Sequence, residues 1–377
     1  MLKLGVLNDQ SGPYRGNGGP GSVACVKQAV QEFASQHGLN VEVISADHQG
    51  KPDIGLGIAR QWFDQGVDVA MDFQNSAIAL AVAGLAREKD KIALPCNAGT
   101  AELTGKQCSP NTIHWAYDTY MLARTVGGAT VKTGGDTWFF ITADYAFGHA
   151  LESSTTNFIK KAGGRVLGDI NMPFPSNDFS SALLRAQMSG AKVIGFANAG
   201  TDTVNCIKQA AEFGISQHNT KMAALLLMIN DVHALGLNTA HGLLLANVFY
   251  WDLNDRTRAF AKRVQTSVGA MPTMSQAACY GAALHYMKAA AEMGVADIKK
   301  SGRAAVARMK AMPVDDEPFG RCRIRDDGRV LHTAYLFEVK KPDESTKPWD
   351  YYKLVATVPP DEAWRPLADG GCPFVRT

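Results

Sequence analysis

The chain has 377 residues and a net charge of +2, which is more length than one hydrophobic core usually serves, so two domains are expected. Hydrophobic residues make up 46% and charged residues 20%, which excludes disordered and fibrous classes. Lys and Arg are scattered along the chain, so neither nucleic acid nor an anionic membrane surface is an expected partner.

Short apolar strands alternate with helices in the first hundred residues. The predicted strands are Leu2–Leu7, Val41–Ser45, Val67–Met71 and Ile92–Pro95, and the predicted helices between them are Gly19–Gln36, Pro52–Asp64 and Ala77–Glu88. Short, mainly apolar strands that are separated by helices are typical of a parallel α/β sheet covered on both faces.

The same alternation restarts after a loop-rich stretch at residues 97–112. The predicted strands here are Thr137–Thr142, Val166–Ile170, Val193–Ala197, Met222–Ile229 and Leu243–Tyr250, with helices at Gly148–Lys161, Ser180–Met188 and Thr203–Phe213. The longest apolar run, Met222–Ile229, has the length of a buried strand rather than of a membrane span. Two doubly wound α/β modules therefore follow each other along the chain.

The last third is rich in helix and then in loops. Helices are predicted at Arg256–Thr266, Met274–Met293 and Arg303–Met312, and they suit the outer layer of a module that the chain has already built. Such a return requires several crossings between modules, and no Pro/Ser-rich linker separates them. Asp327-Gly328 predicts a hairpin turn between the strands Cys322–Arg325 and Val330–Val339, and residues 347–377 are predicted to cover surface.

Seven cysteines bear on the compartment of the protein. Cys25, Cys96, Cys206, Cys279 and Cys322 lie in helical or strand-like runs and are predicted to be small buried side chains. Cys108 and Cys372 lie in Pro-containing loops, where a disulfide in an oxidising compartment is expected. Met1 leads directly into a strand, so either the protein is cytoplasmic or a leader has been removed.

A glycine-rich segment raises the alternative of an enzyme. Gly16–Gly21 has the spacing G-x-G-x-x-G, and Asp47 ends the next strand, as in an NAD-dependent oxidoreductase. However, Asp9–Arg15 separate the first strand from the glycines, which favours a turn bordering a ligand cleft, or a purely structural loop. The sequence has no G-x-S-x-G, H-E-x-x-H or C-x-x-C, so we expect no catalytic residues, no metal and no cofactor.

Several short stretches carry a family resemblance that covers nearly the whole chain. They are Ser11-Gly12-Pro13-Tyr14, Gly18-Gly19-Pro20-Gly21, Ala46-Asp47-His48, residues 98–104, residues 143–148 and Phe249-Tyr250-Trp251-Asp252. In order and spacing the chain resembles the branched-chain-amino-acid-type solute-binding proteins of ABC transporters. The resemblance implies a periplasmic monomer without its leader, which traps a ligand between two lobes and delivers it to a membrane permease.

The fold implied by the resemblance is the periplasmic binding protein fold of type I, with two doubly wound α/β lobes joined by a three-strand hinge. Lobe 1 would comprise residues 1–117 and 252–318, lobe 2 residues 118–251 and 319–345, and residues 346–377 would form a C-terminal tail. The crossovers would fall near residues 114–118, 248–252 and 318–325.

Ligand-binding candidates follow the carboxyl ends of strands, where open α/β sheets bind ligands. In lobe 1 they are Tyr14, Asn75, Ser76, Ala98, Gly99 and Thr100, with Tyr280 on a later helix; in lobe 2 they are Tyr145, Phe147, Asn198, Gly200, Asp202 and Met228; Tyr250 lies at the hinge. Ser76 opens a helix whose free N–H groups favour an anion, and relatives bind a carboxylate at these positions. The alternative is that Ser76 and Thr100 are ordinary helix caps.

The stretch after the strand Met222–Ile229 bears on the ligand class. The resemblance implies an acidic group there in amino-acid-binding relatives, to neutralise the ammonium group, whereas the matching stretch here reads Leu227-Met228-Ile229-Asn230. Asp202 or Asp231 would be possible substitutes. The aromatic stretches Phe249–Asp252 and Trp349–Tyr352 are similar to a subgroup that takes up benzoate- or cinnamate-like acids. An aromatic carboxylate is therefore the expected ligand; an amino acid or amide, an NAD-dependent enzyme and a ligand-sensing module remain as alternatives.

Overall fold

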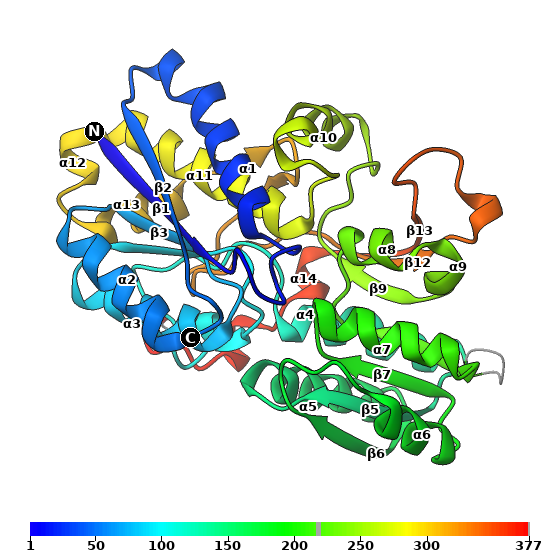
Figure 1. Ribbon diagram of the computed structural model, residues 1–377. Coiled ribbons are helices and arrows are strands. Elements are labelled where there is room, and N and C mark those ends of the chain that lie inside the picture. Colours follow the sequence, from blue (N-terminus) through cyan, green and yellow to red (C-terminus); the bar gives the residue numbers. More distant parts are fainter. Residues whose placement is uncertain (216–219, 376–377) are drawn as a thin grey trace. The chain divides into compact units, whose positions relative to one another are not determined.

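The computed structural model describes residues 1–215 and 220–375, and the chain divides into two compact units (Figure 1). Unit 1 comprises Met1–Tyr117, Phe249–His332 and Arg365–Thr377, and unit 2 comprises Asp118–Val248 and Thr333–Trp364. The chain thus passes between units at four points rather than at the three predicted. Residues 346–377 do not form a separate tail, because they are divided between the two units.

Unit 1 is built on a parallel four-stranded sheet with the order β2-β1-β3-β4. The strands are β1 (Leu2–Asn8), β2 (Val41–Asp47), β3 (Val69–Asp72) and β4 (Ile92–Pro95), and an antiparallel pair, β10 (Val314–Asp316) and β11 (Gly320–Cys322), lies outside it. The helices are α1 (Gly19–Phe33), α2 (Pro52–Asp64), α3 (Ser76–Glu88), α10 (Asp255–Val268), α11 (Met274–Met293), α12 (Val295–Ile298) and α13 (Gly302–Ala311), with short 3₁₀ turns η1 (Ser35–His37), η2 (Ala101–Thr104) and η5 (Leu367–Asp369).

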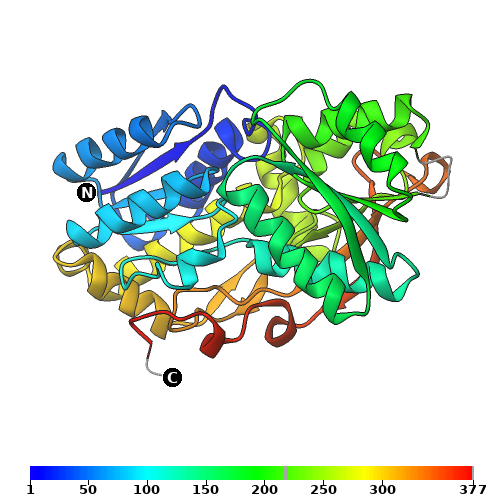
Figure 2. The same cartoon turned by 90° about the horizontal axis from the view of Figure 1, so that it is seen from below.

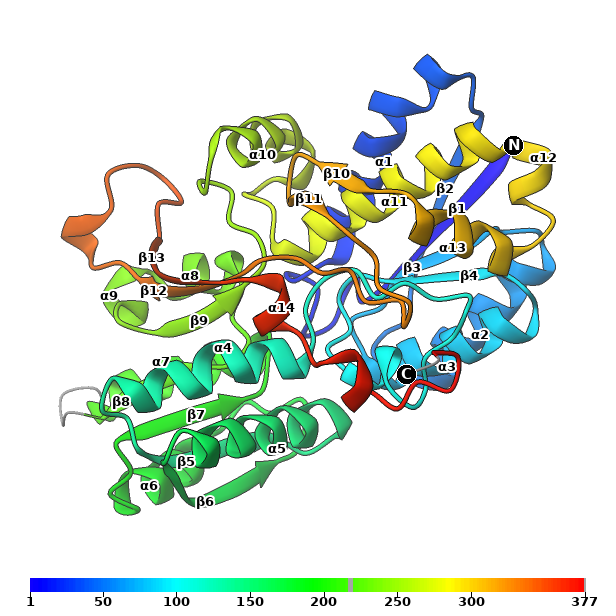
Figure 3. The same ribbon diagram turned by 180° about the vertical axis from the view of Figure 1, so that it is seen from behind.

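The helices of unit 1 pack in two layers (Figures 1 and 3). Helix α1 packs against α10 and α11, whereas α2 packs against α3. The core between the sheet and α2 and α3 contains the fully or nearly fully buried side chains of Leu7, Trp62, Phe63, Phe73 and Ile78. Burial of these apolar surfaces fixes the sheet, so that the loops after β1, β3 and β4 leave it at one edge.

Unit 2 contains a seven-stranded sheet with the order β13-β12-β9-β8-β7-β5-β6 (Figures 1 and 2). Its strands are β5 (Thr137–Ala143), β6 (Arg165–Met172), β7 (Val193–Ala197), β8 (Lys221–Ala224), β9 (Leu244–Asn247), β12 (Ala334–Val339) and β13 (Tyr352–Val358). Its helices are α4 (Thr119–Lys132), α5 (Ala146–Lys161), α6 (Ser180–Met188), α7 (Thr201–Glu212), α8 (Ile229–Leu235), α9 (Leu237–Ala240) and α14 (Pro360–Ala363), with η4 (Pro342–Glu344). Helices α4 and α5 lie side by side on one face (Figure 3).

The structure differs from the prediction at several elements. The strand predicted at 222–229 ends at Ala224, because Met228 already begins the turn into α8. The Asp327-Gly328 turn forms, but only one bridge, between Ile324 and Val330, joins the segments around it. The strand predicted at Val330–Val339 begins only at Ala334, as β12, and pairs with β9 and β13 instead. Helix α4 and strand β13 were not predicted, and β13 is paired to β12 rather than lying loosely on the surface.

The disulfide expected from the sequence is present. It joins Cys108 to Cys372, whose Cα atoms lie 5.6 Å apart, within unit 1. Cys25, Cys96, Cys206 and Cys279 are buried free thiols as predicted, whereas Cys322 is only partly buried. Within residues 1–215 and 220–375, every helix is too short or too polar to cross a membrane.

Two glycines in helices provide a test of this packing. A Cβ atom on Gly148, in α5, would lie 2.0 Å from the carbonyl oxygen of Ala143, whereas a Cβ on Gly57, in α2, would meet nothing within 4 Å. We expect Gly148→Ala to lower the free energy of unfolding by about 1 to 3 kcal/mol. Gly57→Ala should raise it by up to about 1 kcal/mol, because alanine is the better helix former. Urea denaturation of both variants measures the difference, and equal effects would contradict the close packing of α5 on β5.

Candidate functional site

The start of helix α3 presents a buried hydroxyl without a partner. Asn75 caps the helix, since its Oδ1 accepts the backbone N–H groups of Ala77 and Ile78 at 2.9 and 3.3 Å. Ser76 follows, is 1% exposed, and its Oγ has no hydrogen-bond partner among the described residues. A buried hydroxyl without a partner is costly, and it lies where a helix favours an anion. Asn75 thus acts as the cap, and Ser76 is left available to a ligand.

The loop after β4 is held by hydrogen bonds from side chains at residues 114 and 117. The Ala98 carbonyl accepts a hydrogen bond from His114 Nε2 at 2.7 Å, and the Asn97 carbonyl accepts one from the Tyr117 hydroxyl at 2.8 Å. Burial, with the nearby charge of Arg329, lowers the pKa of His114 well below its usual value, so its imidazole is neutral. Thr100 Oγ1 caps η2 by accepting the Glu102 N–H at 3.2 Å. Gly99 is buried between these anchored residues.

The turn between β1 and α1 is organised by its own acidic side chains. Asp9 accepts the backbone N–H groups of Gly12 and Tyr14 at 2.7 and 2.9 Å, and Tyr14 is buried. Asp47 accepts from the Ser11 hydroxyl at 2.6 Å and from the backbone of Gln10 and Gln49. The Asp47 carboxylate is thus engaged by the protein, which argues against a role in holding a ribose.

The glycines of the same turn are needed for packing. A Cβ on Gly18 would lie 2.6 Å from Gln74 Nε2 and 2.8 Å from Asn97 Nδ2, and a Cβ on Gly21 would lie 2.2 Å from Gln276 Nε2. Ten residues, 9–18, separate the end of β1 at Asn8 from the start of α1 at Gly19. These contacts favour a structural turn at the strand ends over a dinucleotide-binding loop.

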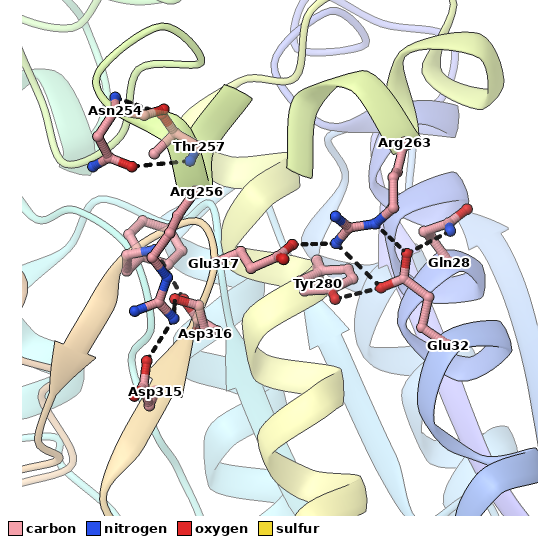
Figure 4. Close-up of polar contacts among 11 residues, drawn as sticks. Gln28, Glu32, Asn254, Arg256, Thr257, Arg263, Tyr280, Asp315, Asp316 and Glu317 are labelled. Carbon is pink, nitrogen blue, oxygen red and sulfur yellow. Dashed lines mark hydrogen bonds and ion pairs between the residues drawn. The ribbon is translucent and has the colours of Figure 1, made fainter. Parts of the chain in front are cut away.

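Tyr280 belongs to a polar cluster between helices (Figure 4). Its hydroxyl donates to Glu32 Oε2 at 2.6 Å, and Glu32 Oε1 accepts from Arg263 Nε at 2.6 Å, which links α1, α10 and α11. Because the Tyr280 hydroxyl is already bonded to Glu32, we do not assign Tyr280 to the ligand site. Tyr250 is also buried, with its ring edge-on to Trp251 at 6.0 Å.

In unit 2, aromatic rings gather where β5 and β6 end. Tyr145 begins α5, and its half-buried ring stacks on Phe174 with the centroids 4.9 Å apart. Phe147 lies 6.0 Å from Tyr145 by the same measure. Phe174 was not among the predicted residues; the signal that would have found it is its place between Pro173 and Pro175, directly after β6. Phe147 is buried, whereas the stacked rings of Tyr145 and Phe174 are partly exposed and offer apolar surface of the kind that small aromatic ligands contact.

The start of α7 holds the loop that carries Phe174. Asp202 is 1% exposed, and its Oδ1 and Oδ2 accept the backbone N–H of Ser176 at 3.2 and 3.3 Å. Burial raises the pKa of Asp202 to about 6. Asn198 is engaged locally, since its Oδ1 accepts from the Thr203 hydroxyl at 2.7 Å. Gly200 has a φ of +62°, which favours glycine at this turn.

Met228 marks the start of α8 and is fully buried. Its N–H donates to Asp231 Oδ2 at 2.9 Å, while Asn230 Nδ2 lies 3.2 Å from Asp231 Oδ1. Burial raises the pKa of Asp231 to about 7, so a large share of this side chain is uncharged near neutral pH. Asp202 and Asp231 are therefore both engaged by the backbone and poorly suited to neutralise an ammonium group.

Taken unit by unit, the structure groups most of the predicted residues. Asn75, Ser76 and the 98–100 loop lie at the strand ends of unit 1, and Tyr145, Phe147 and Met228 lie at those of unit 2. In the parts of the chain that the structure describes, no group of three or more His, Cys, Asp or Glu side chains is arranged to hold a metal ion. The strand ends of unit 1 offer hydrogen-bond donors, and those of unit 2 offer aromatic rings.

Comparison with known proteins gives a consistent match. Residues 1–346 match the family model described as periplasmic binding protein. A periplasmic binding protein from Burkholderia mallei is 45% identical, with 100% of this chain and 99% of that chain covered and a TM-score of 0.95. A branched chain amino acid ABC transporter periplasmic ligand-binding protein from Burkholderia xenovorans LB400 is 37% identical, with 99% and 100% covered and a TM-score of 0.88.

A more distant structure shares the fold alone. A solute binding protein of an R. palustris ABC transporter, solved in complex with 4-hydroxybenzoate, is 21% identical, with 95% of this chain and 97% of that chain covered and a TM-score of 0.85. These matches confirm the fold class and the family resemblance that the sequence indicated.

Proposed function

Because the chain belongs to the periplasmic binding protein family, the solute-binding receptors of ABC transporters, we propose that its ligand is a small aromatic carboxylate. In this proposal the protein acts outside the cytoplasm after removal of a leader, as a monomer without catalytic activity. It captures a benzoate- or cinnamate-like acid and delivers it to a membrane permease.

The observation that carries the proposal is the unpartnered Ser76 hydroxyl. It is buried at the start of α3, so a ligand oxygen that accepts from it removes the cost of an unsatisfied donor. The loop at 98–100 is fixed by His114 and Tyr117, which supports a preorganised site for a carboxylate. Preorganised donors lower the ordering cost that binding otherwise incurs.

The rings of unit 2 support the aromatic part of the ligand. Tyr145, Phe147 and Phe174 would cover a benzene ring, which buries roughly 150 Å² and contributes about 4 kcal/mol. Carboxylate hydrogen bonds contribute about 1.5 to 3 kcal/mol each against the cost of association.

A branched-chain or other amino acid is the second candidate. The relative from Burkholderia xenovorans LB400, named as a branched chain amino acid transporter component, favours it. Met228 opposes it, because a buried thioether stands where amino-acid-binding relatives carry a carboxylate. Asp202 and Asp231 are weaker substitutes for that carboxylate, since both are buried, already accept backbone N–H groups and have pKa values raised by burial.

A thermal-shift screen separates these candidates. The purified protein is heated with benzoate, 4-hydroxybenzoate, leucine, acetate or NADH, and ligands that bind the folded state raise its melting temperature. We expect the aromatic acids to give the largest shifts. A shift with leucine alone would favour the second candidate, and a shift with NADH and no acid would contradict the assignment as a solute receptor.

Phe174 tests the aromatic surface. We expect Phe174→Ala to weaken the binding of 4-hydroxybenzoate about tenfold, because the ring loses a stacking partner worth about 1.4 kcal/mol. Phe213→Ala is the matched control, since Phe213 is a partly exposed phenylalanine at the C-terminal end of α7, whereas the loop of Phe174 is held at the start of that helix. Calorimetric titration measures both variants, and equal affinities would remove Phe174 from the site.

A further inference from the structure

Asp72 is connected to both loops of the candidate site in unit 1, to one along the chain and to the other by backbone hydrogen bonds. It is the last residue of β3, three residues before Asn75, and its carbonyl accepts the N–H groups of Cys96 and Asn97 at 2.9 and 3.2 Å. The residue and its neighbour Phe73 have φ values of +85° and +59°, which are rare for non-glycine residues and tend to occur at functional sites. The backbone of Asp72 therefore sets the course of the loop at 73–76 and of the loop at 96–100.

The Asp72 side chain is fully buried and incompletely satisfied. Its Oδ2 accepts from Asn8 Nδ2 at 2.9 Å, whereas Oδ1 has no hydrogen-bond partner in the described part of the chain. Within the described ranges, no Lys or Arg side chain forms a hydrogen bond or an ion pair with Asp72. Burial raises the pKa of Asp72 to about 6, against the opposing effect of the nearby Asn8, Ser22 and Cys279 side chains.

The titratable groups packed around Asp72 are neutral thiols on the neighbouring elements. Burial raises the pKa of Cys25 on α1 and of Cys279 on α11, and Cys279 in turn neighbours Cys96 after β4. Further out, Gln74 accepts the N–H of Asp9 at 2.7 Å and neighbours His48, whose pKa burial lowers. The nearest titratable side chains therefore provide no positive charge to balance an ionised Asp72.

Unsatisfied polar atoms converge above this carboxyl group. Where a Cβ on Gly18 would lie, Asp72 Oδ2 is 2.9 Å away, Gln74 Nε2 is 2.6 Å away and Asn97 Nδ2 is 2.8 Å away. Both amide nitrogens, and Asn8 Oδ1, have no hydrogen-bond partner within residues 1–215 and 220–375. A proton on Asp72 Oδ1 removes the buried charge and provides a donor for an acceptor such as Asn8 Oδ1, whereas the two amide nitrogens are themselves donors.

We propose that Asp72 positions the two carboxylate-binding loops of unit 1 and takes up a proton from solvent when an anionic ligand binds there. The inference rests on the proposed function. A ligand carboxylate adds a second negative charge near the strand ends, so ionised Asp72 is destabilised in the complex more than in the free protein. Affinity should then be highest at low pH and should fall as the pH rises through the window in which Asp72 ionises.

The test compares Asp72→Asn with wild type by calorimetric titration of benzoate between pH 5.5 and 7.5. We expect the wild-type affinity to fall about fivefold or more over this range, and that of Asp72→Asn to change by less than twofold. Asp316→Asn is the matched control. Asp316, on β10, is another buried carboxyl group of unit 1, and burial raises its pKa to about 7. Asp316→Asn should keep the wild-type slope.

Titration in buffers of different ionisation enthalpy counts the protons directly. Wild type and Asp316→Asn should take up a measurable fraction of a proton on binding benzoate, and Asp72→Asn should take up less. The inference is overturned if Asp72→Asn keeps both the wild-type slope and the wild-type proton uptake. If the affinity of Asp72→Asn still falls with pH, but less steeply than that of wild type, the remaining fall would be assigned to Asp202 and Asp231 of unit 2.

A ligand-free measurement separates failure of this inference from failure of the proposed function. A carboxyl group whose pKa is raised by folding favours the folded state when protonated, and that contribution is lost as the pH rises from about 4 to about 6. The melting temperature of wild type should therefore fall relative to that of Asp72→Asn across this window. A constant difference overturns proton uptake at Asp72, whereas absence of acid binding to wild type overturns the proposed function alone.

Discussion

Replacing Cys108 and Cys372 together by serine should lower the free energy of unfolding by about 2 to 5 kcal/mol. The disulfide joins residues 264 positions apart, so its loss frees a very large loop in the unfolded chain. In the folded state it also anchors the last segment of unit 1, which otherwise depends on contacts such as the Arg365 guanidinium with the Ala101 carbonyl at 2.8 Å.

Urea denaturation with and without a thiol reductant measures this effect. Reductant should lower the midpoint of wild type and leave that of the double serine variant unchanged. Cys322→Ser is the control, because Cys322 is a partly buried cysteine outside the disulfide. A double variant as stable as wild type would show that the crosslink adds nothing beyond the packing of residues 365–375.

Ser76→Ala should separate ligand binding from stability. The variant removes a hydroxyl that has no partner among the described residues, so the ligand-free protein should be as stable as wild type or slightly more stable. The complex loses a hydrogen bond to a charged group, worth about 1.5 to 3 kcal/mol, so affinity for an aromatic acid should fall roughly 10- to 100-fold.

Ser180→Ala provides the matched control, since Ser180 is also the first residue of a helix, α6 in unit 2. Calorimetry gives the affinities, and thermal melting without ligand gives the stabilities. Unchanged affinity in Ser76→Ala would remove the hydroxyl from the site, and a marked loss of stability would show that it is an ordinary structural group.

The regular elements could be predicted where local pattern alone determines them. The predicted ranges of helices α2, α6 and α11 and of strands β4 and β7 agree with the structure residue for residue. The predicted strand at 222–229 ran too long, because an unbroken apolar run does not show where a strand ends and a buried turn begins. Helix α4 escaped prediction because Gly127 and Gly128 interrupt its pattern, and β13 because its edge position leaves most of its side chains at least partly exposed.

The candidate site was predictable only in part, for a related reason. Ser76 and Tyr145 follow strands and begin helices, which a single sequence shows. Asp72 depends on a neighbour distant in sequence, the Asn8 amide, and no local spacing reveals it. Phe174 has a local signal in its two flanking prolines after β6, but its stacking on Tyr145 does not follow from the sequence. Tyr280 was predicted to contact the ligand, because the sequence gives no sign that its hydroxyl is bound to Glu32 instead.

A crystal structure of the protein grown with 4-hydroxybenzoate tests the central claim most directly. We expect one bound molecule whose carboxylate lies within hydrogen-bonding distance of Ser76 Oγ and the 98–100 loop, and whose ring contacts Tyr145 and Phe174. A molecule bound elsewhere, or an amino acid retained from expression with its ammonium group on Asp202 or Asp231, would contradict it.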